Sequence, residues 1–239
     1  MKRLRLIMLL SIAIIACIGT NAADATNTIE AQNATVKWAF GKGADNESTA
    51  ETSVPEAISS TSFSLGNKLY FKGVQGTLSK LNPTEKIANA KDDDAYVAFS
   101  IVTKKGVNFS PKNIVFSAQK LGTSGGTIDV YAKYDGKSVE LIKSYNPERS
   151  SASTTELDLS NIGTINGKIE FVFYVYNLAV NKQLGLGNII VTGDFEGSPV
   201  SVPTYSLSVG SNDENAGKIT INPAGDKFDE GTQITVATT

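Results

Sequence analysis

The sequence predicts an all-β protein: an antiparallel β-sandwich of jelly-roll type, followed by part of a small β-repeat module. Short segments that alternate apolar and polar residues recur along the chain, separated by turns rich in glycine, asparagine, aspartate and proline. Beyond the N-terminal segment no stretch has the 3.6-residue period of an amphipathic helix. About eight to ten strands without intervening helices favour two packed antiparallel sheets.

The sandwich is expected over 35–196. Alternation predicts its strands at 35–40, 68–72, 95–103, 113–119, 127–134, 138–143, 154–159, 167–177 and 187–193. Asp135 and Gly136, between two of these segments, are typical of a type I′ hairpin turn. The stretch 41–62 is rich in small polar residues and is expected to form a long loop.

The N-terminus has the pattern of an export signal. Lys2, Arg3 and Arg5 precede an apolar run over 6–16 that is too short to span a bilayer comfortably. We expect a signal peptide at 1–22 with cleavage after Ala22, then a flexible leader over 23–34. A second interpretation stays open, because residues 14–17 fit a bacterial lipobox in which Cys17 is acylated and anchors the protein to a membrane.

Composition excludes several kinds of chemistry. The sequence contains no histidine, which removes imidazole acid–base catalysis, histidine-based nucleophile systems and histidine zinc sites. Its single cysteine lies in the export segment, so the exported chain is expected to contain no disulfide. Without the three basic residues of the signal, 19 basic residues stand against 24 acidic ones, a net charge of −5. This balance gives no electrostatic footprint for nucleic acid or an anionic membrane surface.

A linker and a second module are expected after the sandwich. Two prolines and small residues over 197–203 are typical of a stiff, exposed linker. Beyond it, 205–209, 218–221 and 233–236 alternate strictly and predict three more strands. The last of these has no following partner, and an unpaired strand edge promotes aggregation. We therefore expect the chain to be the N-terminal piece of a longer secreted protein.

Two resemblances follow from short motifs. Tyr205, Leu207 and Val209, the stretch 217–225 (GKITINPAG) and the stretch 228–236 (FDEGTQITV) resemble the bacterial repeat related to internalin B-repeats. This resemblance implies a small all-β module of secreted surface proteins, of which 204–239 is the incomplete first half. Segments 36–43 (VKWAFGKG), 121–130 (LGTSGGTIDV) and 182–193 (KQLGLGNIIVTG) resemble the N-terminal accessory module found ahead of pectate-lyase-like domains. This second resemblance implies a longer parent that is a polysaccharide lyase.

Four aromatic residues are candidates for glycan binding, since a flat ring can stack on the C–H face of a sugar. Tyr131 shares a strand face with Asp129 and Lys133, and Tyr174 and Tyr176 share a face of their own strand. Packing between strands is the alternative role for these tyrosines. Trp38 is the only tryptophan, but it alternates with Val36 and Phe40, which favours a core position.

The densest acidic run is Asp92, Asp93 and Asp94. Carboxylates on a loop could bind Ca²⁺, which is the only cofactor that the sequence suggests. A solvated charge run that protects a strand edge is the alternative, because consecutive side chains point in different directions and no calcium-loop pattern follows.

The function expected from these features is non-catalytic carbohydrate binding or positioning in a secreted polysaccharide-degrading protein, directed at a plant or other extracellular polysaccharide of the pectin class. A surface adhesion or spacer role without glycan binding is the alternative. Catalysis within the chain is not expected, because Arg149, the only arginine after the signal, is adjacent to Glu148 in a turn. No spacing nominates a pair of hydrolytic carboxylates either.

Overall fold

The computed structural model describes residues 28–41, 50–123, 125–200, 204–207, 219–225, 227–229 and 232–238. The chain divides into two compact units, one over Thr26–Val200 and one that contains the residues from Ser201 onward. The predicted export segment, with Cys17 and the cleavage position, lies outside the described residues. Within the ranges that are described, no helix is long and apolar enough to cross a membrane.

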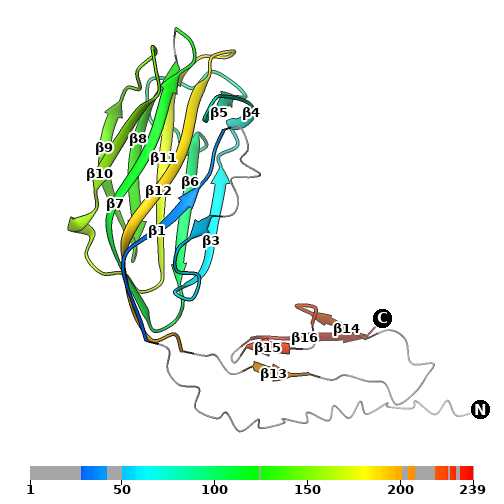
Figure 1. The fold of residues 1–239 in the computed structure, drawn as a ribbon. Coiled ribbons are helices and arrows are strands. Elements are labelled where there is room, and N and C mark those ends of the chain that lie inside the picture. Colours follow the sequence, from blue (N-terminus) through cyan, green and yellow to red (C-terminus); the bar gives the residue numbers. More distant parts are fainter. Residues whose placement is uncertain are drawn as a thin grey trace, which may run out of the picture. The chain divides into compact units, whose positions relative to one another are not determined.

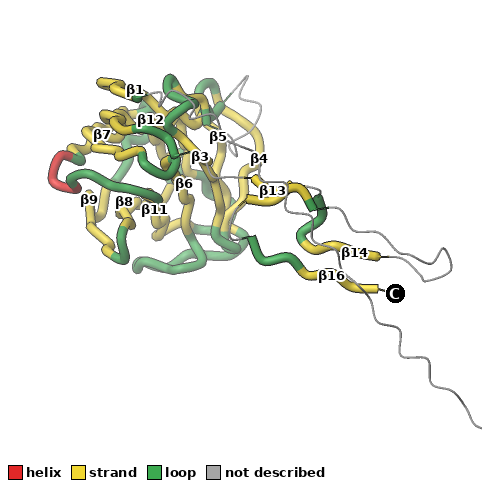
Figure 2. Tube along the Cα trace, turned by 90° about the horizontal axis from the view of Figure 1, so that it is seen from below, coloured by secondary structure: helices red, strands yellow, loops and turns green. Residues whose placement is uncertain are grey.

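The larger unit is a sandwich of two antiparallel sheets, seen from the side in Figure 1 and as two layers in Figure 2. Sheet A has the order β10-β7-β12-β1-β2, and β5 pairs with both β12 and β4. Its strands are β1 (Ile29–Trp38), β2 (Glu51–Thr52), β4 (Leu69–Gln75), β5 (Leu78–Pro83), β7 (Val107–Lys120), β10 (Ser153–Asp158) and β12 (Leu184–Gly197).

Sheet B is five-stranded, with the order β3-β6-β11-β8-β9. Its strands are β3 (Ile58–Leu65), β6 (Tyr96–Thr103), β8 (Gly125–Tyr134), β9 (Lys137–Tyr145) and β11 (Lys168–Leu178). A single 3-10 turn, η1 (Ser160–Ile162), connects β10 to β11. The fold class predicted from the sequence, an all-β antiparallel sandwich of jelly-roll type, is confirmed.

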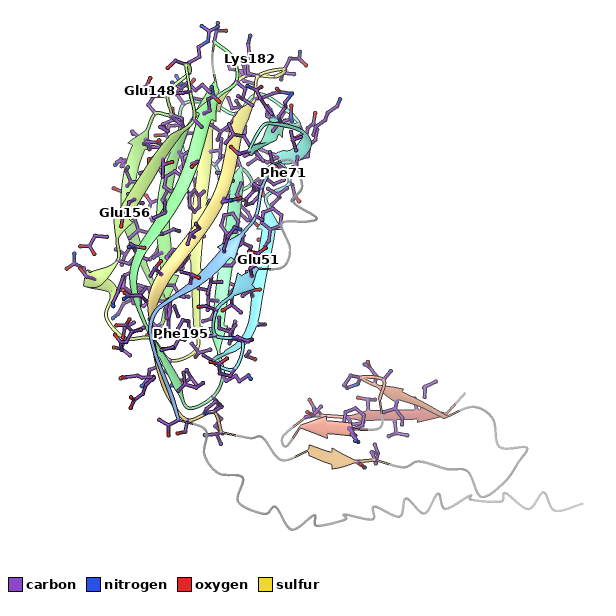
Figure 3. All side chains as sticks on the ribbon, in the orientation of Figure 1. Glu51, Phe71, Glu148, Glu156, Lys182 and Phe195 are labelled. Carbon is purple, nitrogen blue, oxygen red and sulfur yellow. The ribbon has the colours of Figure 1, made fainter. Side chains whose placement is uncertain are left out.

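The core forms where alternation sends apolar side chains between the two sheets. On β11, Ile169, Phe171, Phe173 and Val175 all lie inside and are at most 1% exposed. Phe99 on β6 lies at the centre of an aromatic cluster, with its ring centroid 5.3 Å from that of Trp38, 5.9 Å from Phe40 and 5.6 Å from Phe173. Figure 3 labels Phe195 on β12 toward one end of this interior and Phe71 in the lobe of β4 and β5.

Two predicted loops contain strands instead. The leader expected over 23–34 is wrong from Ile29 onward, because β1 begins there and pairs with β12 as far as Gly197. A bulge between Ala31 and Ala34 breaks the alternation, and Asn33 lies at its centre with a φ of 52°. Its backbone N–H donates to the Asp194 carboxylate at 2.9 Å, which stabilises the bulge. Because the residues within the bulge are polar, the sequence does not show the alternation by which a strand is predicted.

The long loop expected over 41–62 is also wrong in its second half. Residues 42–49 lie outside the described ranges, but β2 and most of β3 fall within 50–62. β3 is an edge strand rich in serine, and only Ile58 on it is buried. The serine-rich composition of β3 therefore reflects its exposure to solvent. In the sequence, these serines indicated a loop.

The second unit contains two short strand pairs. β13 (Thr204–Ser206) pairs with β15 (Lys227–Asp229), and β14 (Ile219–Asn222) pairs with β16 (Thr235–Thr238). The predicted strands at 205–209, 218–221 and 233–236 overlap three of these four. β15 falls in the segment 228–236 that carries the resemblance to the bacterial repeat, and it was not predicted as a separate strand.

Candidate functional site

The outer face of sheet B carries a row of residues that crosses all five strands. Strand register places Ser64 opposite Ala98, Ala98 opposite Val172, Val172 opposite Tyr131 and Tyr131 opposite Glu140. With neighbouring strands about 4.8 Å apart, the row spans about 19 Å. Because Ser64, Ala98 and Val172 are small or medium-sized, this part of the row is low and forms the floor of a trough across β3, β6 and β11. Tyr131 and Glu140 continue the row beyond that floor.

Larger side chains stand on either side of this floor. On one side Tyr96 on β6 is opposite Tyr174 on β11, and on the other Glu170 on β11 is opposite Lys133 on β8. Together with Asp93 they enclose a hollow of about 360 Å³ over the trough. The site therefore combines a low floor, an aromatic wall on one side and charged groups of both signs on the other, a composition found in pockets that bind small polar ligands.

The tyrosines pack against one another through ring edges. The centroid of Tyr174 lies 5.6 Å from that of Tyr131 and 6.4 Å from that of Tyr96, both in T-shaped geometry. Tyr174 is only 5% exposed, and its hydroxyl accepts a hydrogen bond of 2.9 Å from the Lys133 ammonium. Tyr96 and Tyr131 are half-buried, so they are the rings that a ligand can reach.

A segment between β5 and β6 lies against this face. Lys91 places its ammonium 4.4 Å from the ring centroid of Tyr174 and 5.2 Å from that of Tyr131, a cation–π geometry. The segment is held at its end by Gly66, whose N–H donates to the carbonyl of Tyr96 at 2.9 Å. A Cβ at position 66 would lie 2.2 Å from the carbonyl oxygen of Asp94, so the close approach requires glycine.

The Tyr131 hydroxyl is fixed by a carboxylate. It donates a hydrogen bond of 2.6 Å to Glu140 Oε2 on β9, and this bond raises the pKa of Tyr131 to about 12. The charged acceptor holds the phenol in its protonated form. The ring of Tyr131 therefore has a defined orientation against Tyr174, beside the hollow, whose lining does not include Tyr131.

The other aromatic candidates lie elsewhere. The hydroxyl of Tyr176 donates to Asp129 at 3.1 Å and lies 3.0 Å from the Ser144 hydroxyl, outside the hollow, and burial raises the pKa of Tyr176. Trp38 is 0% exposed in the core, so the sequence-based proposal that it contacts a glycan is wrong. Its alternation with Val36 and Phe40 on β1 is the physical reason, since all three side chains point between the sheets.

The three aspartates of the acidic run have separate roles. Asp92 accepts a hydrogen bond of 2.8 Å from Lys68 and another of 2.9 Å from the Asp94 N–H, and both lower the pKa of its carboxyl. Asp93 lines the hollow. Over the described part of the chain, no three acidic side chains are grouped so that they could hold a metal ion. The arrangement gives no support to a calcium site here.

Of the residues nominated from the sequence, Tyr174 and Asp93 line the hollow, and Tyr131 packs against Tyr174 beside it. Tyr96, Glu170 and the floor residues Ala98 and Val172 were not nominated. Alternation within 95–103 places Tyr96 and Ala98 on one face, so the sequence shows that these two residues share a face of their strand. Predicting the trough also requires the register between β6 and β11, which pairs residues about seventy positions apart. No local pattern in the sequence indicates this register.

Comparisons with known proteins give no family. No protein-family model matches the chain, and no curated protein matches it. Among solved structures, a variant of a family 29 carbohydrate binding module is similar at 12% identity with a TM-score of 0.34, covering 55% of this chain and 92% of that one. A family 28 module described as specific for non-crystalline cellulose is similar at 13% identity and a TM-score of 0.30, over 56% of this chain and 87% of that one. Scores this low assign neither family nor function to this chain.

Proposed function

We propose that the sandwich is a non-catalytic module that binds a polysaccharide chain along the trough on the outer face of sheet B. The observation that carries this proposal is the low floor of Ser64, Ala98 and Val172, which crosses β3, β6 and β11 between tyrosines on one side and charged side chains on the other. A polysaccharide is long and narrow, and a trough that crosses three neighbouring strands suits a short stretch of such a ligand.

The chemistry of the trough walls also suits a sugar. The half-buried rings of Tyr96 and Tyr131 offer apolar surface to the C–H groups of a pyranose. Asp93, Glu170 and Lys133 offer acceptors and donors for its hydroxyl groups.

The finer parts of the proposal come from the sequence. The resemblance of 35–196 to an accessory module ahead of pectate-lyase-like domains supports a pectin-class ligand and a lyase as the longer parent. The basic and apolar N-terminus supports export to the medium or the cell surface, with acylation at Cys17 as the alternative. We propose the domain boundary at the Pro/Ser linker, with 204–239 as the first half of a bacterial repeat.

The test is a binding survey with the exported full chain. Polygalacturonate, arabinan, galactan and xylan are compared by isothermal titration calorimetry, with and without calcium. We expect saturable binding to at least one glycan, weakened roughly tenfold or more in a Tyr96→Ala, Tyr131→Ala variant, because a buried aromatic contact typically dominates a binding surface.

Two controls make the result specific. Tyr131→Phe keeps the ring and removes the bond to Glu140, so it should retain most of the affinity. Val139→Ala changes an exposed side chain on β9 that does not line the hollow, and it should bind as the wild type does. Binding that survives loss of both tyrosine rings in a folded protein would place the ligand elsewhere.

One observation favours the spacer role as a second candidate. Tyr174 is 5% exposed and lies beneath Lys91, so its ring contributes to packing on the outer face. If the surface tyrosines serve only to join strands, the folded protein binds none of the four glycans. The same survey therefore decides between the two roles.

A further inference from the structure

A second hollow lies on the outer face of sheet A, in the lobe formed by β4 and β5. Along each of these strands, Leu69 and Leu81 point into the core, so the alternate residues point outward. The outward residues and the turn before β12 enclose a volume of about 440 Å³. Its lining includes Tyr70, Lys72, Lys80, Asn82, Val180 and Gln183.

The charge in this hollow is of one sign. Phe71 on β4 is paired with Leu81 on β5. Lys72 follows Phe71 and Lys80 precedes Leu81, so the two lysines lie on neighbouring strands next to the same residue pair. The lining contains no aspartate or glutamate, and neither lysine forms an ion pair with a described residue. Like charges on neighbouring strands repel, and a bound anion would relieve that repulsion.

The hollow also presents apolar surface to solvent. Tyr70 is 40% exposed and Val180 is 48% exposed, and both belong to the small group of large apolar side chains that are exposed in the described residues. Tyr70 is paired across the strands with Asn82, so the ring lies beside the polar groups of β5. The hollow therefore has an apolar surface beside its two lysines.

A fixed amide completes the arrangement. Asn82 is 6% exposed, its amide donates to the carbonyl of Lys80 at 2.9 Å, and its side-chain oxygen accepts a bond of 2.9 Å from the Gln183 amide. These bonds hold the side chain in one orientation without any ligand. A hydrogen-bonding group that is already oriented loses little freedom when a ligand binds.

We propose that this hollow is a second saccharide site, selective for a sugar that bears a carboxylate. Lys72 and Lys80 bind the carboxylate, the ring of Tyr70 contacts the apolar face of the sugar, and the amides of Asn82 and Gln183 bind its hydroxyl groups. The site lies on the opposite sheet from the trough and shares no lining residue with it. The proposal therefore stands whether or not the trough binds a glycan.

The experiment measures trigalacturonate against neutral galactotriose with the exported full chain, by isothermal titration calorimetry at two salt concentrations. We expect trigalacturonate to bind more tightly than galactotriose, and more weakly as salt is added. A Lys72→Met, Lys80→Met variant should weaken trigalacturonate binding roughly tenfold or more, because bonds to charged groups are strong. Tyr70→Ala should weaken it as well.

A matched charge control is Lys105→Met, Lys143→Met, which removes two exposed lysines that line neither hollow. Equal weakening in this control and in the Lys72, Lys80 variant would overturn the proposal in favour of general electrostatic attraction.

Three other outcomes would also overturn the proposal. Loss of acidic-sugar binding only in the Tyr96→Ala, Tyr131→Ala variant would show that the acidic sugar binds in the trough. Inorganic phosphate that competes fully, with no effect of Tyr70→Ala, would show an anion site only. No binding of trigalacturonate to the folded wild type would also overturn it.

Discussion

Neighbouring residues on β11 face two different surroundings. Phe171 and Phe173 point into a dry interior filled by rings from both sheets, whereas Glu170, Val172 and Tyr174 point to an outer face where apolar and charged groups mix. Both faces contain well-packed aromatic rings, with T-shaped pairs on each. The difference lies in what covers them: a second sheet covers the inner rings, and on the outer face only lysine side chains lie over Tyr174. Stability should therefore depend mainly on the inner face and recognition on the outer one.

The largest effect is expected from the inner face. Phe173→Ala removes a ring that is 1% exposed and lies 5.0 Å from Phe116 and 5.6 Å from Phe99, measured between centroids. The resulting cavity should lower the free energy of unfolding by about 3–5 kcal/mol. Urea unfolding followed by tryptophan fluorescence measures this. Phe173→Leu, which fills much of the space, should cost considerably less, and a loss below about 1 kcal/mol for the alanine variant would contradict the assignment.

A smaller loss is expected at the next position on the outer face. Tyr174→Ala removes contacts with Tyr96 and Tyr131 and the bond from Lys133, and should cost roughly 2 kcal/mol. Tyr174→Phe removes only the hydroxyl and should cost about 1 kcal/mol or less. The same unfolding experiment compares both with Phe173→Ala. If Tyr174→Ala cost as much as Phe173→Ala, the outer face would be a second core and the division between the faces would fail.

The charge on the outer face should appear in a pH titration. The bond to Glu140 raises the pKa of Tyr131 from 10.0 to about 12, so its stabilising contribution is present below pH 10 and is lost as the pH rises through about 12. Ultraviolet absorbance of tyrosinate should show a transition near pH 12 that Tyr131→Phe removes, whereas the late transition of Tyr176, whose pKa is also raised, should remain in that variant. In Glu140→Gln this transition should move toward pH 10. An unchanged transition would show that Glu140 does not hold the phenol.

The smallest effect is expected from removal of the second unit. A chain that ends at Val200 keeps the whole sandwich, including the bond of 2.8 Å from the Val200 N–H to the Lys105 carbonyl. Its free energy of unfolding should match that of the full chain within about 0.5 kcal/mol, because no strand of either sheet is lost. Circular dichroism and thermal unfolding provide the measurement. Aggregation of the shortened chain would place the domain boundary elsewhere.

The sequence predicted the inner face better than the outer one, and the reason is physical. Burial between sheets demands apolar residues at every second position, so the pattern from Ile169 to Val175 is visible locally. On the outer face the demand is weaker, and the trough exists only because β3, β6, β11 and β8 align in one register. Tyr131 and Tyr174 could be nominated from their strands alone. That Tyr96 joins them, and that Lys91 lies above, depends on pairings between distant segments.

The missed first part of β1 and the missed strand β3 have related causes. β1 begins in a polar stretch because a bulge at Asn33 is held by the Asp194 carboxylate from β12, a contact more than one hundred residues away in the chain. β3 is an edge strand, mostly exposed, so serine satisfies it as well as an apolar residue would. In both cases the residues of the strand are polar because they are exposed to solvent, although their backbone is paired in a sheet.

The pairing of β1 with β12 has a mechanical consequence. Ile29 is opposite Gly197, and the Thr28 hydroxyl lies 3.3 Å from that of Ser198, so the polypeptide enters and leaves the sandwich at adjacent points. Tension applied through those two points would act at one end of the hydrogen-bond ladder between β1 and β12 and break its hydrogen bonds one after another. Strands pulled parallel to their length would instead distribute the force over all of their hydrogen bonds at once. A sandwich pulled through these two points should therefore unfold at lower force than one whose terminal strands are pulled along their length.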